Sequence, residues 1–373
     1  MVRWLTRLPA GCALVAALWA ADVRAEPAKS VSYGSGVENG APASTGEYRA
    51  LSFVHFKNQL GLGETLKIDL VSAGDFTELQ NLSFVYEQPF RKDWLLTLKT
   101  AYARTFPGPI TSLYYDQTTL DHGFGGSLTR YWRKSDRLLL FGTAGLQSSD
   151  GRTRRNATGS GILPERYQQR SRDVYGAFGF KFDPSDKTGL FSYFTLEQGV
   201  DWADPVNIRI NSDVTPTVLR YSGTFKRNLP KQFQFAARGE AQWTDDRLGL
   251  QKQFTLGGWN YASAYLAGER LGDIGGGARV EINRLGVKTL KSGMQVYYQP
   301  FVFLDGGLTR NNDALPDEIG STQKKASAGL GISFEATNGL HAGVQMSYPV
   351  AGGSDFEGGD SEPRFLFSIG FKR

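Results

Sequence analysis

Residues Gln232–Trp243 read QFQFAARGEAQW, and this stretch indicates how the whole chain folds. Its odd-numbered positions carry Phe, Phe, Ala, Gly, Ala and Trp, whereas its even-numbered positions carry Gln, Gln, Ala, Arg, Glu and Gln. Successive side chains of a β-strand point to opposite faces. The stretch therefore predicts a strand with one apolar face and one polar, charged face.

The same period of two recurs along the chain. Clear examples are Thr65–Ser72, Trp94–Tyr102, Ala278–Asn283 and Arg364–Phe371. About sixteen such segments fall between Tyr48 and Arg373, each close to the roughly ten residues that a tilted strand needs to cross a bilayer. We therefore expect an all-β protein, a transmembrane antiparallel β-barrel of about sixteen strands.

A soluble β-sandwich is the alternative, because two sheets can also bury their apolar faces against each other. Two features favour the barrel. Charge and glycine occupy the second face of the strands along the whole chain. Aromatic residues also lie near the strand ends, as in the interfacial girdles of membrane barrels; they are Trp94, Tyr102, Tyr131, Trp132 and Trp243.

The N-terminus has the pattern of a secretory signal peptide. Arg3 and Arg7 precede an apolar run over residues 8–20, and Val23-Arg24-Ala25 forms a small-residue cleavage site. A membrane anchor is the alternative, but the run is shorter than the ~20 residues that a spanning helix needs. Residues 1–25 are thus expected to be removed, together with Cys12, the chain's single cysteine. Cysteine-ligated metals and thiol chemistry are then excluded from the mature protein.

Composition also limits the partners. The formal net charge is +5, and three arginines but one aspartate lie in the signal segment, so the mature chain is nearly neutral. The high isoelectric point is therefore no argument for nucleic acid. His55, His122 and His341 are scattered without ligand spacing, so we expect neither a bound metal nor a cofactor.

Residues 26–45 are rich in Gly, Ser, Pro and Ala, which predicts a disordered periplasmic linker before a barrel domain over residues 46–373. Short turns such as Gln88–Asp93 alternate with longer polar loops such as Ser148–Arg170. This asymmetry fits a bacterial outer-membrane barrel with short periplasmic turns and long outer loops. We expect such a barrel to be a monomer.

A second stretch, Phe254–Asn283, reads FTLGGWNYASAYLAGERLGDIGGGARVEIN, in which two strands flank a long glycine-rich loop. A connection of this length usually has a function. The stretch has a strand, Leu-Gly-Gly, an aromatic loop, Gly-Asp-x-Gly and a second strand, in that order. This order resembles the C-terminal barrel of the two-partner secretion transporters, the haemolysin-activator family. Four further segments resemble that family: Asn58–Glu64, Leu82–Phe90, Gln299–Gly307 and Ala326–Ser333. The resemblance covers essentially all of Gly46–Arg373.

This resemblance implies a loop that folds into the barrel lumen and is locked there. In the family, a Val-Arg-Gly-aromatic tip places its arginine against the aspartate of a Phe-x-Asp-x-Gly strand. Here the tip reads Ala262-Ser263-Ala264-Tyr265, while Asp305 is present. A neutral hydrogen bond in place of the ion pair would weaken the lock by roughly 1 kcal/mol or more. We therefore expect a loop that is held less firmly, unless Arg270 or Arg279 serves as the partner.

The resemblance assigns the loop and its lock to a defined set of positions. The expected site residues are Gly257, Gly258, Ser263, Tyr265, Asp273, Gly275, Phe303, Asp305 and Gly307. Family transporters also place two periplasmic POTRA modules before the barrel. Residues 26–45 are too few for one, so a separate periplasmic POTRA-type or chaperone partner is an expectation.

A basic cluster has two interpretations. Its members are Arg152, Arg154, Arg155, Arg166, Arg170 and Arg172. They form either a solvated outer loop or a contact with anionic lipopolysaccharide or a secreted partner. Lipids of the outer membrane are the other expected partners.

The function implied by the resemblance is movement of a secreted partner polypeptide, a haemolysin- or adhesin-type exoprotein, across the outer membrane through a gated pore. A passive porin-like or structural barrel that lost transport is the alternative. An outer-membrane enzyme is least favoured, because no Ser, His and Asp/Glu set can be assembled from the motif spacing.

Overall fold

A computed structural model of the protein describes most of the chain beyond the N-terminal segment. The described residues are 28–41, 47–73, 79–105, 115–157, 165–202, 206, 209–315, 320–352 and 362–373. The expected signal peptide, residues 1–25, lies outside them. Among the described residues, no helix is long and apolar enough to cross a membrane.

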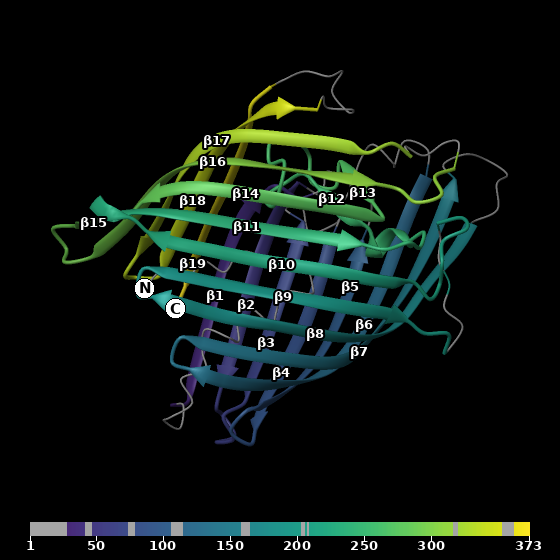
Figure 1. Ribbon diagram of the computed structural model, residues 1–373, viewed down its shortest axis with the longest axis horizontal. Coiled ribbons are helices and arrows are strands. Elements are labelled where there is room, and N and C mark those ends of the chain that lie inside the picture. The colour runs from purple at the N-terminus through teal and green to yellow at the C-terminus, as the bar shows by residue number, and fades with distance from the viewer. Residues whose placement is uncertain are drawn as a thin grey trace.

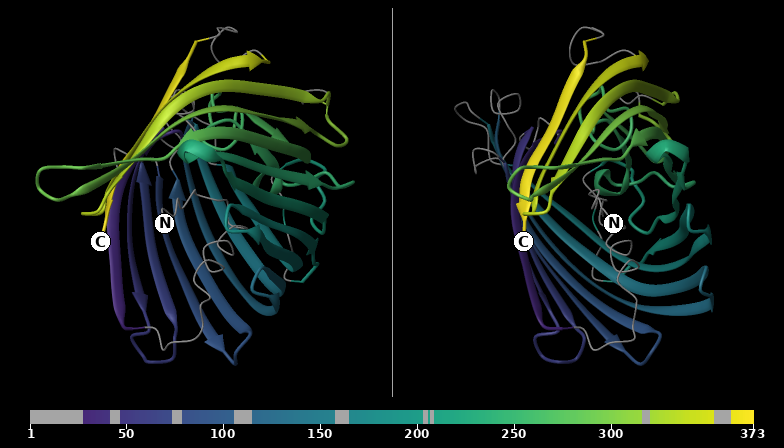
Figure 2. Two further views of the ribbon diagram at one scale, coloured as in Figure 1. Left: turned by 60° about the vertical axis from the view of Figure 1, so that its left-hand side comes forward. Right: turned by 90° about the vertical axis from the view of Figure 1, so that its left-hand side faces the viewer.

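Antiparallel strands form a single sheet that closes on itself, because β1 pairs with both β2 and β19 (Figures 1 and 2). β14 and β15 pair with successive parts of β16 and share one position in the wall, so the barrel has 16 strands. The wall strands are β1 (Ser30–Asn39), β2 (Tyr48–Lys57), β3 (Thr65–Ala73), β4 (Leu79–Phe90), β5 (Trp94–Thr105), β6 (Tyr115–Ser135), β7 (Leu138–Ala157), β8 (Glu165–Ser185), β9 (Thr188–Gly199), β10 (Thr217–Asn228), β11 (Phe233–Trp243), β14 (Ile274–Arg284), β15 (Gly286–Thr289), β16 (Gln295–Arg310), β17 (Gln323–Ala336), β18 (Leu340–Ala351) and β19 (Arg364–Lys372). The predicted fold is confirmed.

Adjacent residues on a strand show how the wall separates two environments. Val174 and Leu196 are exposed on the outside, whereas their chain neighbours Asp173 and Glu197 are buried on the lumen side. In a closed barrel, the outer face meets lipid and the inner face meets the lumen, so apolar and polar residues must alternate. Closure also pairs every strand edge, which the hydrocarbon layer requires.

The expected disordered linker is wrong for residues Ser30–Asn39, which form wall strand β1. Val31, Tyr33 and Val37 are exposed on its outer face, while Gly34 and Glu38 are buried. Glycine and serine at the intervening positions lower the apolar content to that of a linker, although the period of two is intact. Without β1, no strand would join β19 to β2.

The expected long polar loop over Ser148–Arg170 is also wrong. β7 continues to Ala157 and β8 begins at Glu165, so most of this stretch is paired strand. β6, β7 and β8 have 21, 20 and 21 residues, about twice the length that crosses a bilayer. Polar residues occupy the part of these strands beyond the membrane, which is why the sequence resembles a loop there.

The two ends of the barrel differ in their connections. At one end the strands are joined by short turns, residues 91–93, 136–137, 186–187 and 337–339. At the other end lie long connections, including residues 200–216 and 244–273. Short turns are typical of the periplasmic side of such barrels and long loops of the outer side. β15 and the start of β16 project as a ribbon beyond the rest of the wall (Figure 1).

Candidate functional site

The connection between β11 and β14, residues 244–273, folds into the barrel and is called the lumen loop. It contains the short helix η3 (Leu250–Lys252) and a small hairpin of β12 (Phe254–Leu256) and β13 (Arg270–Gly272). Figure 2 shows this green segment inside the ring of strands. The strand that was expected to begin at Phe254 is therefore part of a lumen hairpin, separate from the wall sheet. The expected inward position of the loop is confirmed.

Glycines allow the hairpin to turn tightly and to lie close to the wall. Gly257 has φ +102°, and a Cβ there would meet the Leu266 carbonyl oxygen at 1.8 Å. A Cβ on Gly275 would meet the ring of Phe254 at 2.5 Å, and one on Gly307 would meet Leu256 Cδ2 at 2.6 Å. Larger residues on these wall strands would push the hairpin away.

The tip of the lumen loop contacts three neighbouring wall strands. Ser263 is fully buried, and its N–H donates to Asp305 Oδ1 on β16 at 3.1 Å. Its hydroxyl donates to Ser347 Oγ on β18 at 3.0 Å. The N–H of Ala264 donates to Ser327 Oγ on β17 at 3.0 Å. We call these the tip contacts; from the loop side they use only uncharged groups.

Arg279 is the cation that pairs with Asp305. It lies directly opposite Asp305 in the register of β14 and β16, and its Nη1 is 3.4 Å from Asp305 Oδ2. The guanidinium also lies 3.7 Å from the ring centre of Phe303 and donates to Gln345 Oε1 at 3.2 Å. Of the two substitutes that the sequence left open, the structure places Arg279 in this role.

The sequence led us to expect a neutral hydrogen bond in place of the family's ion pair, and this expectation is wrong in one respect. The acceptor for the Ser263 N–H is a carboxylate that also pairs with Arg279. The bond is therefore assisted by the charge of Asp305. However, the cation belongs to the wall, so the ion pair itself does not join the loop to the wall.

Tyr265 extends the tip towards the next connection. Its hydroxyl donates to the carbonyl oxygens of Ala351, at 2.9 Å, and of Gly352. Its own carbonyl accepts from Arg364 Nη1 at 2.5 Å. Burial and, after it, the neighbouring carboxylate of Glu269 raise the pKa of the Tyr265 phenol, so its hydroxyl stays protonated as a donor.

Three ion pairs join the lumen loop to the wall on either side of the tip. Glu269 Oε1 lies 2.6 Å from Lys325 Nζ on β17, and both side chains are buried. On the other side, Lys252 Nζ pairs with Asp173 on β8 and lies 2.8 Å from Glu197 Oε1 on β9. We call these the flanking ion pairs.

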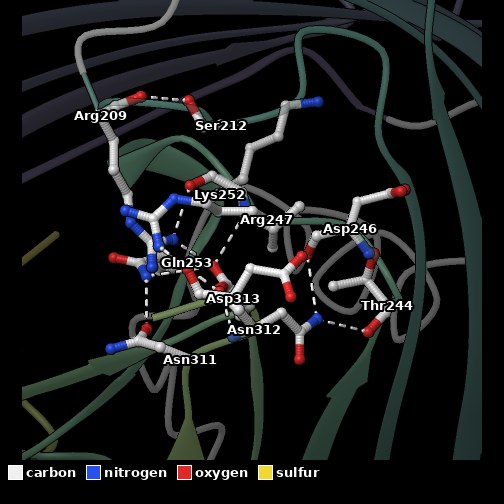
Figure 3. A network of polar contacts seen from close by, with 12 residues as sticks. Arg209, Ser212, Thr244, Asp246, Arg247, Lys252, Gln253, Asn311, Asn312 and Asp313 are labelled. Carbon is white, nitrogen blue, oxygen red and sulfur yellow. Dashed lines mark hydrogen bonds and ion pairs between the residues drawn. The ribbon is translucent and has the colours of Figure 1, made fainter. Parts of the chain in front are cut away.

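Asp273, at the end of the lumen loop, is fully buried and binds other connections. Figure 3 shows its partners Arg209, Gln253 and Asn312. Its Oδ1 accepts from Arg209 Nη1 at 2.5 Å, from the Leu248 N–H at 3.0 Å and from Gln253 Nε2 at 3.1 Å. Its Oδ2 accepts from the Asn312 N–H at 2.8 Å. Arg209 belongs to the β9–β10 connection and Asn312 to the β16–β17 connection, so one carboxylate joins three connections.

Arg247 adds to the same cluster. Its Nε donates to the Ile210 carbonyl oxygen at 2.9 Å and its Nη1 to that of Asp313 at 2.8 Å. Asn312 Nδ2 in turn donates to the Thr244 carbonyl oxygen at 2.9 Å. We call the set of Arg209, Arg247, Gln253, Asp273 and Asn312 the clasp.

The expected site residues other than the glycines thus form two groups. Ser263, Tyr265, Phe303 and Asp305 lie together at the tip contacts, whereas Asp273 lies in the clasp. The sequence did not reveal the clasp partners or the flanking ion pairs. A charged residue at a lumen position next to an outward apolar residue, as at Asp173 and Glu197, is the signal that could have found some of them. Among the described residues, no group of three or more His, Cys, Asp or Glu is placed to hold a metal ion.

A closed 16-strand barrel with an anchored lumen loop defines the class: a bacterial outer-membrane β-barrel. The model of the family "Haemolysin secretion/activation protein ShlB/FhaC/HecB" matches residues 21–334. The chain belongs to this family of two-partner secretion transporters, in which a barrel works with a secreted exoprotein. The expectations of family and outer-membrane location are confirmed.

Solved structures share the fold. CdiB from Escherichia coli has a TM-score of 0.78 at 16% identity, over 94% of this chain and 64% of that chain. CdiB from Acinetobacter baumannii has a TM-score of 0.70 at 14% identity, over 92% of this chain and 60% of that chain. BamA from Haemophilus ducreyi, a structure lacking POTRA domains 1–3, has a TM-score of 0.64 at 16% identity, over 92% and 70%. The chain thus spans less than two thirds of the length of either CdiB.

No curated protein matches this chain in sequence. The separate periplasmic POTRA-type or chaperone partner and the monomeric state stay predictions.

Proposed function

We propose that this chain moves a partner polypeptide across the outer membrane through the barrel lumen, with the lumen loop as its gate. One observation carries the proposal: the loop lies in the lumen, is tied to the wall at its tip and flanks, and is tied to other connections at its end. A loop in this position obstructs the path of an extended chain, so passage requires that part of it moves.

The mechanism uses binding and displacement rather than bond chemistry. The lumen face is polar, so it can exchange hydrogen bonds with an unfolded chain and offers little apolar surface on which that chain would stall. The tip contacts are the part of the gate that opens. The loop contributes only uncharged groups to them, so breaking them does not separate an ion pair. The exoprotein would displace the tip and pass beside it.

A disulfide across the tip contacts tests the gate. Ser263→Cys with Ser347→Cys replaces two hydroxyls whose oxygens are 3.0 Å apart. We expect the oxidised double variant to lose secretion of the exoprotein and to recover it under reductant. Cys12 is the single cysteine of the sequence and lies in the expected signal segment, so no natural cysteine should compete with the introduced pair.

Thr129→Cys with Thr143→Cys is the matched control. Their hydroxyl oxygens are 2.9 Å apart on the lumen face of the neighbouring wall strands β6 and β7. This disulfide would join two wall strands and leave the loop free, so secretion should be normal. Normal secretion through the oxidised Ser263/Ser347 variant would refute the gate.

A passive porin-like channel is the second candidate function. It is favoured by the tip itself, since Ser263 stands where the family has an arginine and the cation for Asp305 comes from the wall. Deleting the gene would then leave all large exoproteins secreted, while the purified barrel would pass small solutes in single-channel recordings. Loss of one exoprotein from the medium would instead support transport.

A further inference from the structure

The membrane-facing side of β6, β7 and β8 carries a group of arginines near the outer end of the barrel. In β7, Arg152 and Arg154 are exposed whereas Gly151 and Thr153 are buried, so the arginines point away from the lumen. Directly opposite residues on antiparallel strands share a face. The register pairs Asp150 with Arg170 and Ser148 with Arg172, which places both β8 arginines on the same outer side.

A fifth arginine comes from β5. Arg104 is opposite Leu120 of β6, and Leu120 is opposite Arg152 of β7. Arg104 and Arg152 are therefore separated by two strand spacings, about 10 Å. We call Arg104, Arg152, Arg154, Arg170 and Arg172 the arginine face.

The arginine face has an excess of positive charge. Asp150 accepts from Arg172 at 2.9 Å and lies 3.6 Å from Arg170, so one carboxylate serves two guanidinium groups. Arg152 lies two residues from Asp150 on the same face, so three guanidinium groups lie around this carboxylate, and an added anion would reduce their repulsion. The face therefore suits a ligand with more than one negative group.

The position of the face identifies the layer in which that ligand lies. Phe124, Leu146 and Val174 are exposed apolar residues on the same outer side of these strands. Arg172 lies two residues closer to the outer end of β8 than Val174, a distance of roughly 7 Å along the strand. Positive charge thus begins where the apolar band ends, at the level of the lipid headgroups.

We propose that the arginine face binds phosphate groups of lipopolysaccharide in the outer leaflet. Long connections mark this end of the barrel as the outer one, and the outward direction of the side chains separates the face from the lumen. Arginine binds phosphate with two parallel hydrogen bonds, and basic clusters beside an apolar surface recognise anionic lipid headgroups. The basic residues that resemble a solvated loop in the sequence are thus an anchor for a phosphorylated glycolipid.

Binding of purified lipid A to the detergent-solubilised barrel tests the proposal, measured by native mass spectrometry. The variant combines Arg152→Gln, Arg154→Gln and Arg172→Gln, and leaves Arg170 to pair with Asp150. We expect the dissociation constant for bisphosphorylated lipid A to rise by about a hundredfold, since each arginine near an anionic lipid contributes about a factor of five. Dephosphorylated lipid A should bind weakly to both proteins.

The control variant removes the same charge at the other end of the barrel, with Lys288→Gln, Lys291→Gln and Lys372→Gln, all exposed. It should bind lipid A as the unaltered protein does, and heat-modifiable mobility in electrophoresis should show that both variants are folded. The proposal is overturned if the arginine variant keeps its affinity, if the control loses as much, or if phosphate on lipid A makes no difference. A loss of exoprotein secretion with unchanged lipid A binding would assign the face to the exoprotein and also overturn it.

Discussion

The tip and the end of the lumen loop are held by different kinds of interaction. At the tip, Ser263 and its neighbours offer backbone N–H groups and hydroxyls to the wall. At the end, Asp273 is a buried carboxylate that accepts from an arginine and three further donors. Breaking a buried ion pair is far more costly than breaking hydrogen bonds that water can replace.

This difference indicates which part of the loop moves. The flanking ion pairs of Lys252 and Glu269 reinforce the end and the sides of the loop, whereas the tip has no charge of its own. A displaced tip would leave the clasp and the flanking ion pairs intact. The loop would then open locally and return to the same place.

The largest expected effect comes from breaking the clasp. Asp273→Ala removes the carboxylate that pairs with the buried Arg209 and accepts from the N–H groups of Leu248 and Asn312. We expect the free energy of unfolding to fall by about 3–5 kcal/mol, measured by urea unfolding of the refolded barrel. Asp136→Ala, in an exposed short turn, is the control and should change it little. Equal midpoints for the two variants would mean that the clasp adds nothing.

A smaller loss of stability is expected when the flanking ion pairs of Lys252 are broken. Lys252→Met leaves Asp173 without its cation, but Arg220 Nη1 still pairs with Glu197 Oε2 at 2.5 Å. The free energy of unfolding should fall by about 2–3 kcal/mol in the same urea assay. A further change of Arg220→Met should then cost more than it does in the unaltered protein, because both carboxylates lose their cations. Strict additivity of the two changes would contradict a shared network.

The third prediction restores an arginine at the tip of the lumen loop, as in the family. Ser263→Arg alone forces a large cation into a fully buried position beside Arg279, and should lower the free energy of unfolding by about 1–3 kcal/mol. Adding Arg279→Ser removes the competing cation and frees Asp305 for the new arginine. The double variant should recover part of the stability, with a coupling of about 0.5–3 kcal/mol. It should also show a lower single-channel conductance than the unaltered protein, since the loop is then tied to the wall by charge.

Unchanged conductance in the double variant would mean that the tip does not control the pore. No coupling between the two positions would mean that Arg279 and the tip do not compete for Asp305.

The smallest effect is expected for Ser263→Ala. The substitution removes the hydroxyl that binds Ser347 but keeps the N–H that binds Asp305. One net hydrogen bond is worth about 1 kcal/mol. The change should appear as faster labelling of a cysteine at Ala264 by a membrane-impermeant maleimide, with the urea midpoint shifted only slightly. A loss as large as that for Asp273→Ala would remove the distinction between tip and end.

The barrel was predictable from the sequence because alternation is a local property. Lipid outside and lumen inside impose a period of two on every wall strand, and this can be read from Gln232–Trp243 without knowing its neighbours. The pattern was missed where apolar residues are few. β1 has only three large apolar residues on its outer face, and β7 and β8 become polar where they leave the membrane.

The site was predictable only where a short motif marks it. The Phe-x-Asp-x-Gly strand and the glycine-rich loop led to Asp305, Phe303 and the tip. The clasp has no such motif. Arg209 and Asp273 are 64 residues apart, and each belongs to a connection whose residues could pair with many others.

The sequence by itself determined a membrane barrel, its apolar and polar faces, and a loop that contacts the carboxylate of Asp305. The tertiary structure decided which cation that carboxylate receives. Arg270 and Arg279 are chemically alike, but the register of β14 and β16 sets Arg279 opposite Asp305, whereas Arg270 lies in the lumen hairpin. The physical reason is that a buried charge takes the partner brought within bonding distance by strand pairing, and pairing depends on contacts far apart in the chain.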